Sequence, residues 1–267
     1  MNHLLRELAP LTSEAWDLLD SEATARLSAV LGARKLVDFV GPLGWQHSAT
    51  STGRVGAVVS APAAGVIARP RVVLPLAEVR ADFSVPRAEL GAAARGAVDV
   101  DLSALDAAAL SIASVENAAV FHGWQELGMT GIVAGSPHQP IATGDDPSRY
   151  ALRVAAAIAS LKRAGVGGPY GLALDYDTWV NVTGGNDAGG APLLTHVQRV
   201  LDGGPIEWAP GIDSPVVLSL RGGDFILESG EDLSIGYSAH TSESVDLYLV
   251  ETFSFRVATP EAAIVLA

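Results

Sequence analysis

The residues with side chains suited to catalysis or metal binding are scattered along this chain of 267 residues. Four of its histidines, at positions His122, His138, His196 and His240, stand far apart. None belongs to a His-x-x-x-His pair that would place two imidazoles on one helix face. The chain has no cysteine, which removes disulfides, thiolate nucleophiles and cysteine-bound metals. The histidines are therefore interpreted as structural or solvated, and no metal site is predicted.

Two aspartate pairs and two glycine pairs are the other candidates for chemistry. Asp175 with Asp177, and Asp145-Asp146, could act as paired carboxylates, but helix capping and solvation explain both. Gly184-Gly185 and Gly189-Gly190 are not followed by Lys-Ser or Lys-Thr, so a phosphate-binding loop is not supported. No Gly-x-Ser-x-Gly elbow is present either. We predict no catalytic residues.

Composition limits the possible partners. Seventeen basic residues against thirty acidic ones argue against nucleic-acid binding, which needs a basic surface. The first ten residues lack the apolar core of a signal peptide, and no uninterrupted apolar run is long enough to span a bilayer. We therefore expect a soluble, cytoplasmic protein without membrane partners. The charged fraction of only 18% fits a subunit that buries surface against copies of itself, although abundant alanine would give the same figure.

Hydrophobic periodicity and turn residues indicate the elements that position these groups. The predicted helices cover residues 12 to about 31 or 37, 103–121, 146 to about 163, and 192–201. A buried strand is predicted over 170–176, a flexible surface loop over 181–192, and a long valine-rich hairpin over 48–75. The last quarter is predicted to form a meander of antiparallel strands from the blocks 221–225, 232–237 and 251–255. This mixture indicates an α+β fold.

One group of residues could bind a partner. Leu27, Val30, Leu31 and Arg34 recur along one side of the first predicted helix, and Asp38 follows it. Arg34 and Asp38 could simply pair with each other. Alternatively, the apolar residues could form a groove for a short apolar peptide, with the charges orienting its backbone or its ends.

Several blocks, in order and at similar spacing over the whole chain, resemble encapsulin shell proteins, also called the linocin-type bacteriocin family. The blocks are Leu4-x-Arg6-x-x-Ala9-Pro10-Leu11-Thr12 with Trp16, Arg34-Lys35-Leu36-Val37-Asp38, Gly41-Pro42-Leu43-Gly44-Trp45, Pro75-Leu76-Ala77-Glu78-Val79-Arg80, Phe121-His122-Gly123, Gly167-Gly168-Pro169-Tyr170 and the three C-terminal blocks.

The resemblance implies the fold of the Hong Kong 97 phage capsid protein. Residues 1–47, 76–130 and 221–267 would form a peripheral domain, 48–75 an extended loop reaching over a neighbouring subunit, and 131–220 an axial domain. The loop at the fivefold pore would comprise Asn186, Asp187, Ala188, Gly189 and Gly190.

The resemblance also implies an icosahedral nanocompartment of sixty subunits or a larger multiple. Such shells enclose cargo, here a dye-decolourising peroxidase or a ferritin-like protein, through a C-terminal targeting peptide that docks on the luminal side. The positions implied for peptide binding are Leu27, Arg34, Asp38, Leu233 and Ile235, with Val30 and Leu31 contributing.

Three departures from the family pattern qualify these expectations. The order Gly32-Ala33-Arg34 separates the glycine from the arginine and changes the local bend beside the groove. Arg87-Ala88 occupies the region where some relatives place a flavin-binding tryptophan, so no cofactor is predicted. Ala191-Pro192 replaces Tyr-Pro near the pore, which predicts a less bulky and more mobile pore loop. A prophage major capsid protein and a bacteriocin or protease-type enzyme are the alternatives.

Overall fold

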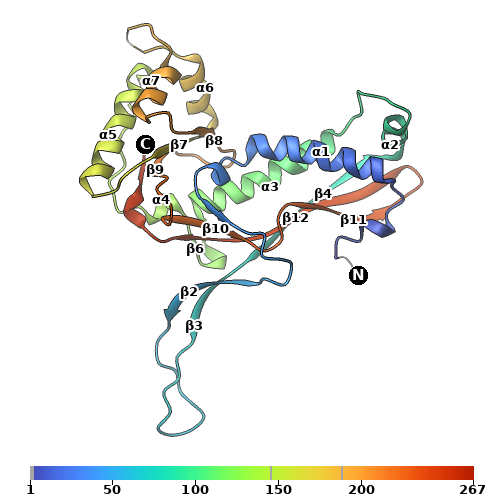
Figure 1. The fold of residues 1–267 in the computed structure, drawn as a ribbon, viewed down its shortest axis with the longest axis horizontal. Helices are drawn as coiled ribbons and strands as arrows, with labels where there is room; N and C mark the ends of the chain where they lie inside the picture. The colour runs from blue at the N-terminus through green and yellow to red at the C-terminus, as the bar shows by residue number, and fades with distance from the viewer. Residues whose placement is uncertain (1–2, 145, 188) are drawn as a thin grey trace.

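The computed structural model describes residues 3–144, 146–187 and 189–267. Its main body is a long sheet covered by two long helices, with a smaller lobe at one end and a thin hairpin projecting away (Figure 1). The helices are α1 (Ser13–Val30), α2 (Arg87–Ala94), α3 (Ser103–Phe121), α4 (Ile132–Gly135), α5 (Tyr150–Arg163), α6 (Tyr176–Gly184) and α7 (Leu193–Val200). The strands are β1 (Asp38–Val40), β2 (Ala49–Val55), β3 (Arg71–Pro75), β4 (Ala77–Pro86), β5 (Gly123–Trp124), β6 (Met129–Thr130), β7 (Tyr170–Leu174), β8 (Ile206–Trp208), β9 (Val216–Ser219), β10 (Phe225–Ser229), β11 (Ser234–His240), β12 (Ser244–Val257) and β13 (Ala263–Val265).

The large sheet is organised around the long strand β12. β10 and β11 pair antiparallel with successive parts of β12, and β4 pairs along the first part of it. The predicted meander is therefore wrong, because β10 and β11 each pair with β12 and not with each other. The prediction failed because strand periodicity identifies the strands but contains no information about which strands become neighbours.

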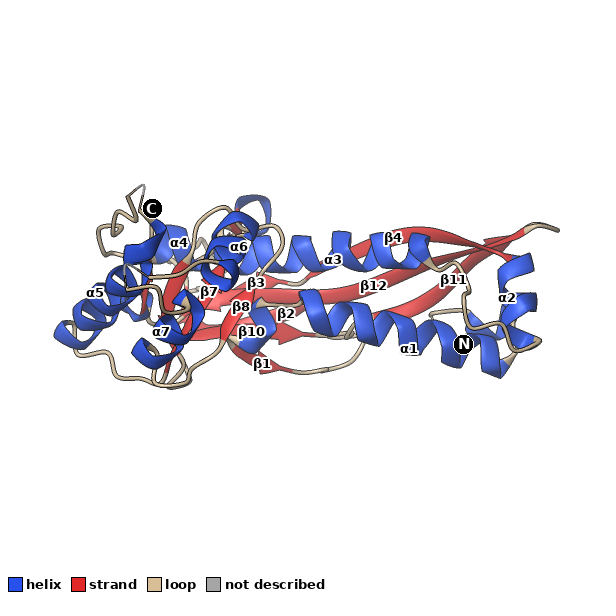
Figure 2. Ribbon diagram, turned by 90° about the horizontal axis from the view of Figure 1, so that it is seen from above, coloured by secondary structure: helices blue, strands red, loops and turns tan. Residues whose placement is uncertain are grey.

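The two long helices lie side by side over one face of this sheet, as Figure 2 shows. β4 alternates strictly, with Val79, Phe83 and Val85 buried and the residues between them largely exposed. α3 packs on this apolar face, and α1 packs on α3. The length and apolar composition of α3 would also suit a membrane span, but 56% of its apolar window is buried inside the protein. Its packing between α1 and β4 accounts for that composition.

The smaller lobe has its own four-stranded sheet, in the order β13-β9-β7-β8. β7 is buried along its whole length, and α5, α6 and α7 surround this sheet (Figure 1). β13 pairs with β9, so residues 263–265 lie in this lobe although the sequence assigned 221–267 to the peripheral domain. The chain end returns to the small sheet because Ala263, Ile264 and Val265 are apolar and bury themselves there.

Two further local expectations need correction. The segment 181–192 was expected to be loop, but α6 continues to Gly184. Asp175 begins this helix, because its carboxylate accepts hydrogen bonds from the Thr178 backbone N–H and hydroxyl, which confirms the capping interpretation for that aspartate. α2 was not predicted, since eight alanine-rich residues give little periodic signal.

Candidate functional site

The most exposed apolar feature of the subunit is its projecting hairpin, which we call the arm (residues 48–75). β2 and β3 pair antiparallel at its base, and the tip extends well beyond the body (Figure 1). Its large apolar side chains are more than one-third exposed at seven positions, namely Val55, Val58, Val59, Val66, Ile67, Val72 and Val73. A two-stranded ribbon with its apolar side chains in water needs another surface to cover it.

The arm also differs in charge from the rest of the chain. It carries the exposed arginines Arg54, Arg69 and Arg71 and no acidic residue, so all thirty acidic residues lie elsewhere. A basic arm and an acidic body attract each other when they belong to different copies of the chain.

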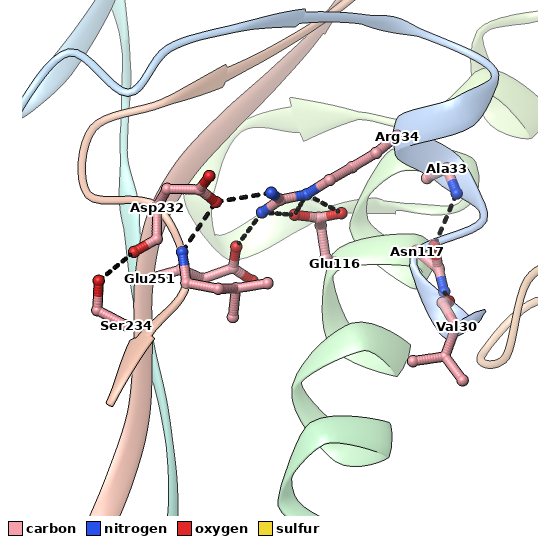
Figure 3. Close-up of polar contacts among 9 residues, drawn as sticks. Val30, Ala33, Arg34, Glu116, Asn117, Asp232, Ser234 and Glu251 are labelled. Carbon is pink, nitrogen blue, oxygen red and sulfur yellow. Dashed lines mark hydrogen bonds and ion pairs between the residues drawn. The ribbon is translucent and has the colours of Figure 1, made fainter. Parts of the chain in front are cut away.

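A buried ion cluster lies at the C-terminal end of α1 and is centred on Arg34 (Figure 3). Its Nη2 lies 2.6 Å from Glu116 on α3 and 2.8 Å from Glu251 on β12. Its Nη1 lies 2.6 Å from Asp232, in the turn between β10 and β11. Phe39 of β1 packs against the guanidinium, with its ring centroid 4.7 Å away. One side chain thus contacts three segments that lie at least 82 positions away from it in the sequence.

The cluster contains more negative charge than one arginine can balance. The side chains of Glu116 and Glu251 are fully buried, whereas that of Asp232 is 40% exposed. Burial and then the negative charge of Glu116 raise the pKa of Glu251 well above its ordinary value, although Arg34 lowers it. Burial would lower the pKa of Arg34, but Glu116, Glu251 and Asp232 together raise it. Arg34 therefore stays charged, and Glu251 keeps its proton to higher pH than an ordinary glutamate.

Asn117, next to Glu116 on α3, connects the same region to the small lobe. Its Oδ1 accepts a hydrogen bond from the Ala33 backbone N–H at 2.9 Å. Its Nδ2 donates to the carbonyls of Val30 at 2.9 Å and Pro210 at 3.0 Å. The side chain is fully buried, and it bonds backbone groups at the end of α1 that a further helical turn would otherwise satisfy. This role cannot be predicted from the sequence, because an asparagine inside an apolar helix has no spacing signature.

Gly32 lies where the end of α1 comes close to the small lobe. A Cβ atom at this position would lie 2.6 Å from the carbonyl oxygen of Trp208 on β8. The glycine therefore allows the end of α1 to approach the small lobe closely, and Arg34 follows within a short 3₁₀ helix, Ala33–Lys35.

The apolar residues suggested for peptide binding differ in accessibility. Leu27, Leu31 and Ile235 belong to one buried core cluster and are only 6%, 8% and 2% exposed. Val30 and Leu233 are half-buried at the edge of that cluster. Only the last two offer appreciable apolar surface to a guest.

Arg34 and Asp38, the two charged residues suggested for peptide binding, do not form the local ion pair that their spacing allows. Arg34 belongs to the buried cluster, while the Asp38 carboxylate accepts a hydrogen bond from the Gly223 backbone N–H at 2.5 Å. Asp38 therefore fixes the turn before β10.

The segment suggested for the pore is a hydrogen-bonded turn between α6 and α7. Asp187 Oδ1 accepts from the backbone N–H groups of Gly189 at 2.8 Å and Ala191 at 2.9 Å. Its Oδ2 lies 3.4 Å from His196 Nδ1. Asn186 and Pro192 form an isolated antiparallel β-bridge across the turn. The hydrogen bond from Ala191, followed by that from Gly189, lowers the pKa of Asp187. Gly190 completes the turn, and Ala188 lies outside the described residues.

Comparison with known proteins decides which family this architecture represents. A family model described as an encapsulating protein for peroxidase matches residues 1–254. A type 1 encapsulin shell protein of Rhodospirillum rubrum is 44% identical, covering 100% of this chain and 96% of the relative. The chain belongs to the encapsulin shell protein family. Further shell proteins of this type, from Brevibacterium linens and Mycobacterium tuberculosis, are 39% and 38% identical over the full length of both chains.

Solved structures confirm the capsid fold of the Hong Kong 97 type. A virus-like particle from Pyrococcus furiosus superimposes with a TM-score of 0.63 at 16% identity, covering 94% of this chain and 99% of that one. The capsid of an empty GTA particle gives a TM-score of 0.52 at 16% identity, covering 88% and 89%. The α+β capsid-like fold is thus confirmed. The full-length identity to encapsulins, compared with fold-level similarity to capsids, favours a cellular shell protein over a prophage capsid.

Membership in this family means that the subunit is a structural component of a multi-subunit cage built from copies of itself. Among the described residues, no group of three or more histidine or acidic side chains is arranged to hold a metal ion.

Proposed function

We propose that this chain assembles into a closed icosahedral compartment in the cytoplasm and that this compartment encloses a cargo enzyme. The arm is the observation that carries the proposal. Ile67, near its tip, is 77% exposed, and Val58 and Val66 are 57% and 59% exposed. None of the described residues covers these side chains, whereas a neighbouring subunit can do so around a symmetry axis.

The charges of the arm favour contact between the arm of one copy and the body of another. A body that carries all the acidic residues repels other bodies, but it attracts the arm, with Arg54, Arg69 and Arg71, of another copy. Assembly should therefore begin with arm-to-body contacts, and salt should slow it by screening them.

An experiment on the arm tests assembly with a matched control. We expect the apolar side chain of Ile67 to be buried only in the contact between subunits. Ile67→Asp places a carboxylate there, and burying a carboxylate without a charged or hydrogen-bonding partner is costly, so the substitution weakens the contact. Val98→Asp is the control, because Val98 is 99% exposed on the loop between α2 and α3 and lies outside the arm. We expect the control to form particles and Ile67→Asp to remain as small oligomers in sedimentation velocity. Normal particles from Ile67→Asp would refute the role of the arm.

For the cargo we propose a peroxidase or a ferritin-like protein held by its C-terminal peptide. The matching family is described as encapsulating a peroxidase, which supports the first of these. We propose that Val30 and Leu233 contact the apolar side chains of the peptide. Arg34 and Asp232 would orient its polar groups, with Asp232 as the exposed member of the pair. Leu27, Leu31 and Ile235 would support that surface from beneath.

Cargo loading can be tested separately from assembly. A fluorescent protein carrying the C-terminal segment of the peroxidase from the same host is co-expressed with each shell variant. We expect Leu233→Asp to lower the reporter-to-shell ratio at least tenfold while particles still form, since a carboxylate opposes the burial of an apolar peptide there. The matched Val98→Asp shell should load normally. Equal loading of both variants would show that the peptide binds elsewhere.

A further inference from the structure

A cavity of about 440 Å³ lies in the small lobe, and its lining shares no residue with the arm or with the Arg34 cluster. Its walls come from the loop before α5, from α5, α6 and α7, from the segment before β9, and from Leu266 and Ala267 after β13. This volume falls within the ~300–1,000 Å³ typical of small-molecule sites. The polar members of its lining are Thr143, Asp146, Tyr150, Asp175, Thr178, Asn181, Asp213 and Ser214.

The charge of this lining has one sign. Asp146, Asp175 and Asp213 all line the cavity, and the described residues of its lining include no lysine, arginine or histidine. The basic side chains that interact with this lining lie outside it: Arg149 and Arg153 act on Asp146, and His122 Nε2 lies 3.3 Å from Asp213 Oδ1. An anionic ligand is therefore disfavoured, and a cationic one is favoured.

A buried tyrosine in the wall gives a second, independent indication. Tyr150 is only 6% exposed and lines the cavity, and its hydroxyl has no hydrogen-bond partner within the described part of the chain. Burial and then the negative charge of Asp175 raise the pKa of this phenol, so it stays neutral. A buried hydroxyl without a partner is costly, and a ligand that bonds to it removes that cost.

We propose that this cavity binds a small organic ammonium ion. Its N–H groups would donate to the Tyr150 oxygen and to the carboxylates of Asp146 and Asp213, and the tyrosine ring would add cation–π attraction. A bare metal ion fits less well, because the described residues contain no group of three metal-ligating side chains within reach of one ion. The cavity is also larger than one cation needs, which favours a chain with two amino groups.

Calorimetric titration of the purified assembly with 1,4-diaminobutane tests this proposal. The neutral 1,4-butanediol, which has the same carbon chain, is the matched ligand control. We expect saturable binding of about one diamine per subunit and no binding of the diol. Tyr150→Phe should weaken binding roughly 2- to 10-fold, because it removes one hydrogen bond and keeps the ring. Asp213→Asn should also weaken it.

Asp99→Asn is the matched protein control, since Asp99 is an exposed carboxylate in the loop before α3. It should bind the diamine as the unaltered protein does. Equal weakening in the Asp99 and Asp213 variants would show general charge attraction only, and no saturable binding would refute the site outright. If Tyr150→Phe fails to fold, the comparison of Asp213 with Asp99 still decides. The outcome does not depend on the cargo or on the size of the shell.

Discussion

Replacing Arg34 with methionine tests whether the buried cluster holds the subunit together. The substitution keeps a long apolar side chain but removes the guanidinium N–H groups that donate hydrogen bonds to Glu116, Glu251 and Asp232. Two fully buried carboxyl groups then lose their cation. Breaking a buried pair in this way costs about 3–5 kcal/mol.

Protonation limits this loss. The pKa of Glu251 is already raised by burial and by Glu116, so without Arg34 its carboxyl accepts a proton more readily still. The destabilisation should therefore be largest at alkaline pH and shrink as the pH falls toward 5. At neutral pH, a loss of this size corresponds to a decrease in Tm of roughly 10 °C for a chain of this length.

Thermal unfolding at fixed subunit concentration is the assay, because assembly couples stability to concentration. Lys35→Met is the matched control, since Lys35 is the neighbouring cation and its pair with Glu207 is partly exposed. An exposed pair contributes less than ~1 kcal/mol, so Lys35→Met should shift the Tm only slightly. Equal shifts for the two variants, or a shift for Arg34→Met that does not vary with pH, would refute the reasoning.

Three further substitutions extend these expectations. Because the folded pKa of Glu251 lies above its ordinary value of about 4.5, its contribution to stability is complete below that pH and declines as the pH rises through the folded pKa. Glu251→Gln should therefore flatten the dependence of Tm on pH between 5 and 8. An unchanged slope of Tm against pH would show that another group causes the dependence. Asn117→Ala should cost roughly 3 kcal/mol in denaturant unfolding, since three backbone groups lose their buried partner; a loss below 1 kcal/mol would contradict that role. Asp187→Ala should raise amide hydrogen exchange at Gly189 and Ala191, which donate to its carboxylate, and unchanged exchange would show that the turn holds without it.

The sequence predicted the elements better than their arrangement. Residues 103–121 form the predicted helix, and Thr12 caps α1 by accepting a hydrogen bond from the Ala15 backbone N–H. Both features depend on local periodicity and capping chemistry. The arm was also predicted, because valines interrupted by glycine and proline indicate a hairpin wherever they occur.

The parts that could not be predicted depend on contacts between distant segments. Arg34 pairs with Glu116, 82 positions away, and with Glu251, 217 positions away, so no local pattern contains the cluster. The burial of Ile235 follows from its place opposite Leu249 on β12, which its own strand does not reveal. Residue alternation marks an apolar position, but it does not show whether a core or a guest covers it.

Cryo-electron microscopy of the purified chain tests the central claim most directly. A subunit with an exposed apolar arm and the capsid fold should form closed, uniform spherical shells at micromolar concentration. The arm of each subunit should lie against the body of a neighbour, with Ile67 buried in that contact. Monomers or small oligomers, or closed shells in which the arm remains exposed to solvent, would contradict the account.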